Sequence, residues 1–413
     1  MRRRGNDRED FCEDQRRFGA CTWSKAVAHP LRREPFRLFF PLGVLLSWAG
    51  VGHWLLHGLG VLPDFKPIFH AMTQIQGFLI CFALGFLFTM IPRRTETDPP
   101  GAVHLILGAT GPIFTTVAAW FDRWSLAQAG WLLTVGTLLS FLISRLIAAQ
   151  SRRRPPNSFV WLPVSFLMGL GGSLLAGYGA ANGDWSLHHL GQTLVLQGMF
   201  AGLVMGVGGL AIPLMTRGEK PADGSPSWRD LLARGAHLLA AAVLIASFVI
   251  EARGQSSSGY VLRGGVLLLT LILGPELHRA PTRPGWVRLL VWISAWLVPL
   301  GFFLAAALTE HPKAGLHLTF IGGLGMLTLA VSTLVTLAHG GQEELTTGRP
   351  WEVPVIAAAC LLAFGARVAM EYDRDRYFQW MSVAAACFLG ATMAWVVFVV
   401  PKLRRPQVSG APS

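Results

Sequence analysis

The chain has 413 residues, of which 52% are apolar and only 14% are charged. Soluble domains carry about a quarter charged residues, and the mean hydropathy of +0.46 is high for one. The composition therefore excludes a water-soluble fold and indicates a protein that crosses the lipid bilayer several times. The net charge of +12 comes from basic residues gathered at the ends of apolar runs, without interleaved aromatic residues. This distribution is typical of membrane topology signals and argues against nucleic acid as a partner.

Residues 1–34 form a basic stretch that begins Met1-Arg2-Arg3-Arg4. A signal peptide needs an apolar run of about 7–15 residues, and this stretch has none. We expect a disordered cytoplasmic tail here and a second, short cytoplasmic tail at 402–413. The transmembrane domain is then predicted over 35–401.

Twelve apolar runs lie between the two tails. A helix needs about 20 mostly apolar residues to cross a hydrocarbon layer about 30 Å thick, because it rises about 1.5 Å per residue. Strands of a membrane β-barrel would alternate with period two and be about half as long. The sequence therefore predicts an all-α polytopic membrane protein, a bundle of twelve transmembrane helices joined by short loops. The predicted helix cores are 38–61, 68–91, 102–120, 126–149, 159–180, 188–213, 230–250, 259–277, 286–309, 315–338, 351–370 and 378–400.

Basic residues are divided unevenly between the two predicted membrane faces. Of the 35 Lys and Arg residues, 27 lie in the tails, in the even-numbered loops or beside them, and eight lie on the opposite side. Cytoplasmic loops carry the excess of Lys and Arg in membrane proteins, so both termini are expected to be cytoplasmic. The predicted spans hold no carboxylate far from a helix end, which disfavours proton pumping.

Five cysteines are present, and none belongs to a C-x-x-C or C-x-x-C-H motif. A cysteine zinc site and covalent haem attachment are therefore excluded. Any haem in this chain would be held non-covalently, as b-type haem is.

Histidine is the residue type that carries the predicted chemistry. The chain has twelve, and seven of them gather near the predicted outer ends of helices 1, 2, 6 and 10. A single histidine at a helix end is more often an interfacial residue than a ligand, but seven at one level favour a cofactor or metal site. Imidazole suits haem iron, copper and zinc alike, so the residue type alone does not select the metal. The seven are His53, His57, His70, His188, His189, His311 and His317.

Part of this cluster could hold a second metal. His53 and His57 are four residues apart on one helix face, with side chains about 6 Å apart, a spacing at which two imidazoles can share a metal. Met72 follows His70 by two residues, and its thioether would favour haem or reduced copper over zinc. We predict His53, His57, Met72 and His311 as candidate metal ligands.

Several stretches of the chain are similar to motifs of one protein family. Residues 35–40, Pro-Phe-Arg-Leu-Phe-Phe, resemble the P-F-R-x-F-F start of the NnrS family. His70, with Gly-Phe at 77–78 and Gly-Phe-Leu-Phe-Thr-Met-Ile-Pro at 85–92, looks like the family's H-x-H-E-M-x-x-G-F…G-F-L-L-T-x-x-P helix. Residues 208–216 resemble its G-G-R-x-x-P-x-F-T segment.

The resemblance extends to the tenth helix. There His317, Gly325 and the His-Gly-Gly at 339–341 are similar to the family's H…G…G-H-T-G pattern. Met72 and Thr73 stand where the family has its second histidine and its glutamate. The similar stretches run from helix 1 to helix 10 in order, so the resemblance covers most of the chain.

The NnrS resemblance implies a twelve-helix protein of the bacterial inner membrane that contains haem and copper and is linked to nitric oxide metabolism or resistance. On this resemblance His70 and His317 are the first candidate haem ligands. His189 or His188, from the outer histidine cluster, is the next candidate. A small diatomic molecule such as nitric oxide is the expected ligand. The sequence assigns neither catalysis nor an electron donor.

Two other functions remain open at this stage. A twelve-helix secondary transporter without haem would have the same number of spans, but it should show a six-plus-six repeat, and none is evident. A respiratory-type haem–copper reductase is suggested by the adjacent His188 and His189, while the lack of deep carboxylates argues against it. An absorption spectrum of the purified protein, oxidised and then reduced, would separate these functions.

Overall fold

The computed structural model describes residues 29–149 and 154–403. These residues form only helices and their connections, and twelve spans are long and apolar enough to cross a membrane, which confirms the predicted fold class. The ends of the spans differ from the predicted cores by at most four residues, for example Leu273 against the predicted 277.

The predicted tails lie largely outside the described residues, which begin at residue 29 and end at residue 403. Within the predicted N-terminal tail, Pro30–Arg33 form a short helix, α2. His29 Nδ1 accepts a hydrogen bond from the backbone N–H of Leu31 at 3.3 Å, and the fixed φ of Pro30 suits the first helical position. Regular structure therefore begins before the predicted boundary at residue 35.

Nine of the twelve spans consist of one long helix, and two of these are preceded by a single 3-10 turn. A short helix, α16, lies between the tenth and eleventh spans. The bounds are α3 (Phe36–Gly58), α6 (Ala102–Trp120), α7 (Trp124–Ile147), η2 (Asn157–Val160) with α8 (Trp161–Asn182), α11 (Trp228–Ala252), α12 (Ser256–Leu273), α13 (Trp286–Ala307), α16 (Glu343–Thr347), α17 (Glu352–Tyr372), and η5 (Arg374–Arg376) with α18 (Tyr377–Leu403).

The second, sixth and tenth spans have a different construction in three parts. Each begins as an α-helix, widens into a π-helical segment and continues as an α-helix. A π segment changes the direction in which the following side chains point, and such segments are frequent at functional sites. The three spans are α4 (Pro67–Met72), η1 (Thr73–Leu79) and α5 (Ile80–Thr95); α9 (Trp185–Thr193), η3 (Leu194–Gly198) and α10 (Met199–Thr216); and α14 (Pro312–His317), η4 (Leu318–Gly325) and α15 (Met326–His339).

These three-part spans recur at intervals of four, so the fold consists of three successive four-span units. The first unit runs from α3 to α7, the second from η2 to α12, and the third from α13 to α18. In each unit the second span carries the π segment. This interval of four differs from the six-plus-six arrangement expected of many secondary transporters.

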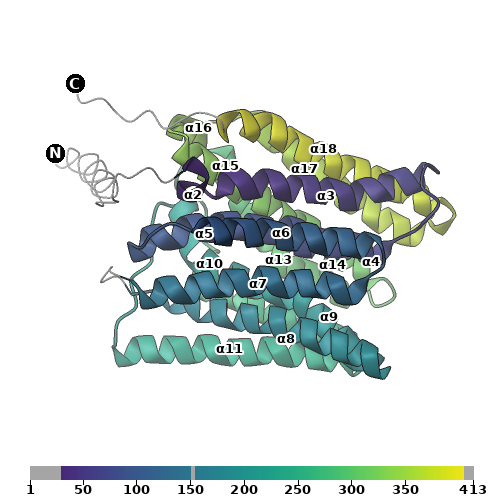
Figure 1. The fold of residues 1–413 in the computed structure, drawn as a ribbon, viewed down its shortest axis with the longest axis horizontal. Coiled ribbons are helices and arrows are strands. Elements are labelled where there is room, and N and C mark those ends of the chain that lie inside the picture. The colour runs from purple at the N-terminus through teal and green to yellow at the C-terminus, as the bar shows by residue number, and fades with distance from the viewer. Residues whose placement is uncertain (1–28, 150–153, 404–413) are drawn as a thin grey trace.

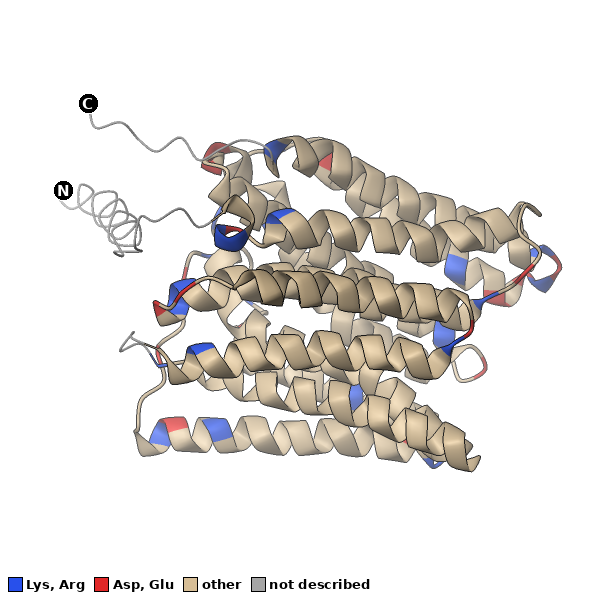
Figure 2. Cartoon of the chain, in the orientation of Figure 1, with Lys and Arg blue, Asp and Glu red and all other residues tan. Residues whose placement is uncertain are grey.

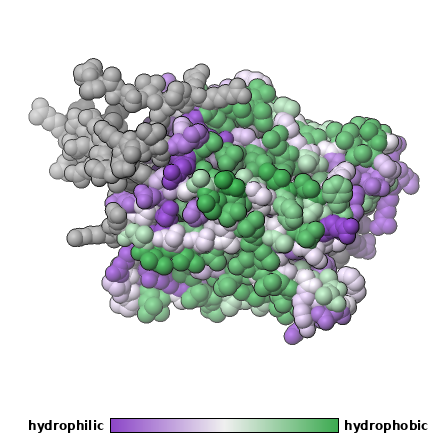
Figure 3. Space-filling view, in the orientation of Figure 1, coloured by the Kyte–Doolittle hydropathy of each residue, from purple (hydrophilic) through white to green (hydrophobic). Residues whose placement is uncertain are grey.

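The three-part spans are also the most enclosed spans of the bundle. The buried share of their apolar windows is 83%, 78% and 67%, against at most 56% for the other nine spans. The helices run roughly along one direction (Figure 1), and charged residues gather at the two ends of the bundle (Figure 2). Apolar side chains cover much of the surface between these ends (Figure 3), as a lipid-facing belt requires.

Glycines let the second span of a unit approach the first closely. A side chain at Gly191 would overlap the backbone of Ala176 in α8, and one at Gly315 would overlap the backbone of Ala305 in α13. Small residues serve this purpose in lipid, where no hydrophobic force draws helices together. The close approach fixes the ends of α9 and α14, where three of the predicted histidines lie.

Candidate functional site

The predicted site residues lie at one end of the bundle, where the chain connects α3 to α4, α8 to α9 and α13 to α14. Following the predicted orientation we call this the outer end; the orientation itself stays a prediction. His70 lies in α4, and His317 is the last residue of α14. His70 therefore lies three residues before the π segment η1, and His317 lies directly before the π segment η4.

Backbone carbonyls orient these two imidazoles. His70 Nδ1 lies 3.2 Å from the carbonyl oxygen of Gly50 in α3, and His317 Nδ1 lies 2.7 Å from that of Lys313. A carbonyl can only accept, so each Nδ1 carries the proton and donates it. Nε2 of each neutral ring then keeps its lone pair, which is the arrangement of metal-ligating histidines whose other nitrogen is held in place.

One buried cation lies close to both rings. Arg367 in α17 interacts electrostatically with His70 and with His317, and the two histidines interact with each other. The Arg367 side chain is only 6% exposed, and its guanidinium lies 5.9 Å from the ring centre of Trp54. The Trp54 ring lies 4.2 Å from that of His70. Four helices thus converge on what we call the imidazole site: Trp54, His70, His317 and Arg367.

Two hydrogen-bond donors of the imidazole site lack a partner among the described residues. Trp54 Nε1 and Arg367 Nε are both buried and make no hydrogen bond. Arg367 directs its other two nitrogens to Met370 Sδ at 2.8 Å and to Glu371 Oε1 at 3.3 Å. Leaving a buried donor unpaired costs about 1–3 kcal/mol. These two donors could serve a ligand that brings acceptor atoms.

A second buried arginine lies in the second unit. Arg263 in α12 is completely buried, and its guanidinium nitrogens donate to Ser247, Gln197 and Glu251 at 2.5–3.3 Å. Tyr260 Oη donates to the other carboxylate oxygen of Glu251 at 2.8 Å. We call Gln197, Glu251, Tyr260 and Arg263 the arginine cluster.

Arg263 and Arg367 are two of the eight basic residues expected on the outer side, and no motif of the sequence gives either a role. The structure places both inside helices and away from solvent. A charged side chain within an apolar span is rare and is a functional hypothesis by default. In the sequence, the sign of their importance was that each arginine falls inside a predicted helix core, 259–277 for Arg263 and 351–370 for Arg367.

His188 and His189 are adjacent in α9 but have different partners. His188 Nδ1 lies 2.8 Å from the carbonyl oxygen of Ala176 in α8, which is the same kind of anchor that His70 has in α3. His189 is half-exposed, and its Nε2 lies 3.6 Å from Glu251 Oε1. His189 therefore borders the arginine cluster, while His70 and His317 form the imidazole site.

His53 and His57 lie together, with ring centres 6.3 Å apart. One nitrogen of each ring is already in use. His53 Nε2 accepts from the backbone N–H of Lys66 at 3.2 Å, and His57 Nδ1 lies 3.0 Å from the carbonyl oxygen of Leu62. His57 Nε2 therefore keeps a lone pair for a metal, whereas Nδ1 of the neutral His53 ring carries the proton and cannot ligate a metal in this arrangement.

The other two predicted metal ligands have different neighbours. Met72 is buried in a small apolar cluster with Phe69 and Ala118. His311 Nδ1 lies 3.5 Å from Glu371 Oε2. Within residues 29–149 and 154–403, no three His, Cys, Asp or Glu side chains are placed to hold one metal ion. A copper site in this chain stays a prediction.

One pairing recurs at the outer end of each unit. A basic residue in or next to the start of the second span contacts an acidic residue at or just after the end of the third span. Because the same contact appears three times, the three units share a design at their outer ends. The pairs are Lys66 Nζ with Asp122 Oδ2 at 2.5 Å, His189 Nε2 with Glu251 Oε1 at 3.6 Å, and His311 Nδ1 with Glu371 Oε2 at 3.5 Å.

The fold and the site together define a multi-pass helical membrane protein with two histidines and a buried arginine converging at one end of the bundle. The NnrS protein family matches residues 30–407, nearly the whole chain, and the protein belongs to this family. The match confirms the resemblance found in the motifs. None of the curated proteins compared with the chain matches it.

Proposed function

We propose that this NnrS-family protein binds b-type haem at its imidazole site and handles nitric oxide or a related diatomic molecule at the bacterial inner membrane. His70 and His317 would ligate the iron through Nε2. The observation that carries the proposal is the convergence of two imidazoles from two central spans, each with its Nδ1 fixed by a carbonyl.

The residues of the site fit a non-covalently held haem. Haem carries carboxylates, and the partnerless donors Trp54 Nε1 and Arg367 Nε suit a carboxylate acceptor. Arg367 also offers a positive charge and a planar guanidinium, which favour recognition of a carboxylate. When bound, the iron would supply redox chemistry, and it would bind a small diatomic molecule once one of the two imidazoles gives up its place.

The chain's own residues would hold and shield this group. The carbonyls of Gly50 and Lys313 keep the two rings in one tautomer and one orientation. Trp54 packs against His70 and would keep water from that side of the ring. His57 and His53 are the pair that this proposal assigns to copper, and His53 would first have to give up its hydrogen bond with the Lys66 N–H.

The test is an absorption spectrum of the detergent-purified protein, oxidised and then reduced, after expression with haem available. We expect near-stoichiometric haem with a Soret band that shifts when nitric oxide is added to the reduced protein. His70→Ala and His317→Ala should each abolish or shift the band, because each removes one iron ligand and leaves the apolar spans intact.

His278→Ala is the matched control. His278 is exposed in the connection between α12 and α13, outside the outer histidine cluster, and its loss should leave the spectrum unchanged. A protein that takes up no haem, or His70 and His317 variants with wild-type spectra and haem content, would contradict the proposal.

A further inference from the structure

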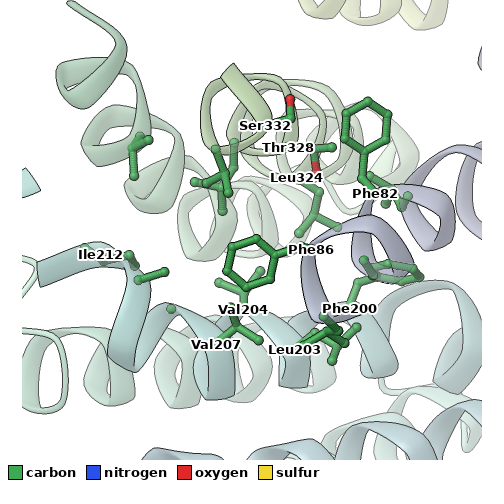
Figure 4. A pocket seen from close by; sticks show the side chains of 18 of the residues that line it. Phe82, Phe86, Phe200, Leu203, Val204, Val207, Ile212, Leu324, Thr328 and Ser332 are labelled. Carbon is green, nitrogen blue, oxygen red and sulfur yellow. The ribbon is translucent and has the colours of Figure 1, made fainter. Parts of the chain in front are cut away.

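An apolar pocket lies where the three four-span units meet. Its volume is about 130 Å³, and all three of the π-containing spans contribute to its lining. Figure 4 shows the side chains that surround it: Phe86 comes from the second span, Val204 and Val207 from the sixth, and Leu324 and Thr328 from the tenth. None of its lining residues belongs to the imidazole site.

The pocket has few hydrogen-bonding partners for water. Among its lining residues only Thr328 and Ser332 have polar side chains. Ser332 Oγ already donates to the carbonyl oxygen of Leu329 at 3.0 Å and accepts from Trp395 Nε1 at 3.1 Å. A buried water usually makes about three hydrogen bonds. This lining does not offer them, so the space is better suited to an apolar occupant.

The volume limits the size of that occupant. A water molecule takes up about 30 Å³ of the liquid, and an engineered apolar cavity of roughly 150 Å³ in another protein stays dry and binds benzene or xenon. The present pocket is close to the latter and has a similar apolar lining of Leu, Val and Phe side chains. A molecule of a few atoms fits this space.

We propose that this axial pocket binds a small, uncharged, apolar molecule of the size of a diatomic gas or a xenon atom. Binding gains dispersion contacts with apolar side chains of the three π-containing spans, and the only polar side chains of the lining that it could desolvate are those of Thr328 and Ser332. The proposal does not depend on haem. If the proposed function also holds, the pocket would store the gaseous ligand of the haem. Only this storage role rests on the proposed function.

The experiment is a xenon titration of the detergent-purified full-length protein, followed by ¹²⁹Xe nuclear magnetic resonance without added haem. The wild type should show a saturable shift on top of the linear response of empty micelles. Ala83→Phe should remove the saturable part or weaken xenon affinity by about tenfold or more, because the ring fills the space. Val207→Phe fills the same space from α10 and should also remove the saturable shift, so it tests the proposal if Ala83→Phe does not fold.

Ala242→Phe is the matched control, since the same substitution is placed on an exposed position of α11. It should keep the saturable shift of the wild type. A purely linear response of the wild type, or an equal saturable shift in the filled variants, would overturn the proposal. The proposal would also be overturned if a lipid chain occupied the pocket of the purified protein and had to be extracted before xenon could bind. Haem absorbance is not the readout, so failure here is distinguishable from failure of the haem proposal.

Discussion

The imidazole site and the arginine cluster contain similar parts, although their arginines lie in different spans of their units: Arg367 in the third span of the third unit and Arg263 in the fourth span of the second. Each contains a buried arginine, and each arginine interacts with a glutamate at the end of the unit's third span and with a tyrosine near the start of the fourth. These residues are Glu371 and Tyr377 in the third unit, and Glu251 and Tyr260 in the second. In both units a histidine at the outer end approaches the glutamate.

The two regions differ in how far their arginine is satisfied. All three nitrogens of the Arg263 guanidinium donate hydrogen bonds, and the group lies 3.7 Å from the ring centre of Phe248. Arg367 leaves Nε without a partner and lies beside two imidazoles. A fully satisfied buried network makes a core rigid, whereas an unsatisfied one indicates a missing partner. The second unit therefore satisfies its arginine with its own side chains, whereas Arg367 keeps one donor nitrogen that the proposed haem could use.

The largest effect is expected when the satisfied network is broken. Arg263→Met leaves Glu251 buried without its cation, and breaking a buried pair in this way costs about 3–5 kcal/mol. The thermal unfolding midpoint of the detergent-purified protein should fall sharply. Adding Glu251→Gln to the same chain should restore much of the loss, because the uncompensated charge is then gone. A single variant as stable as the wild type would mean that the arginine cluster does not hold the second unit together.

Arg367→Gln should act on ligand retention more than on folding. The charge-assisted hydrogen bond to a haem carboxylate is worth about 1.5–3 kcal/mol, so haem should be lost to a competing haem-binding protein about ten- to a hundredfold more readily. The haem-free variant should be destabilised less than Arg263→Met. Wild-type haem retention combined with a large fall in the unfolding midpoint would remove the distinction between the two regions.

Trp54→Phe isolates the second partnerless donor. The phenyl ring keeps most of the packing against His70 and removes the indole N–H. Haem retention should weaken by about 1.5 kcal/mol, the lower end for a hydrogen bond to a charged group, because the indole itself carries no charge. The same competition assay measures it. Unchanged retention would show that the indole nitrogen does not contact the ligand.

The smallest effect is expected at His189. Its half-exposed ring lies 3.6 Å from Glu251, and pairs of this kind contribute less than about 1 kcal/mol. His189→Gln should lower the unfolding midpoint slightly and leave the haem spectrum unchanged. Loss of the Soret band in this variant would instead place the haem in the second unit.

The number and ends of the spans could be predicted from the sequence because hydropathy and length alone decide which segments cross a bilayer. His70 and His317 could be singled out because they recur in family motifs at the same membrane level. Their anchors could not, since the carbonyl that accepts from His70 belongs to Gly50, twenty residues earlier in a different helix. Such a contact depends on how two helices pack and leaves no pattern in the sequence.

The roles of the buried arginines and the four-span interval were missed for related reasons. Arg263 donates a hydrogen bond to Gln197, 66 residues earlier in the chain, and this bond offsets part of the cost of burying the guanidinium. The three units share π segments and outer-end charge pairs, but the residues of those pairs differ between units: Lys with Asp in the first, His with Glu in the other two. A comparison of residue types along the chain does not show this repeat, whereas a comparison of contacts does.

Electron paramagnetic resonance of the oxidised, haem-loaded protein tests the central claim most directly, because the signal depends on the axial ligands of the iron. We predict a low-spin signal typical of two imidazole ligands in the wild type and in His278→Ala. His70→Ala and His317→Ala should each convert it to a high-spin signal or lose the haem. A high-spin signal in the wild type, or a low-spin signal that survives unchanged in both variants, would contradict ligation by His70 and His317.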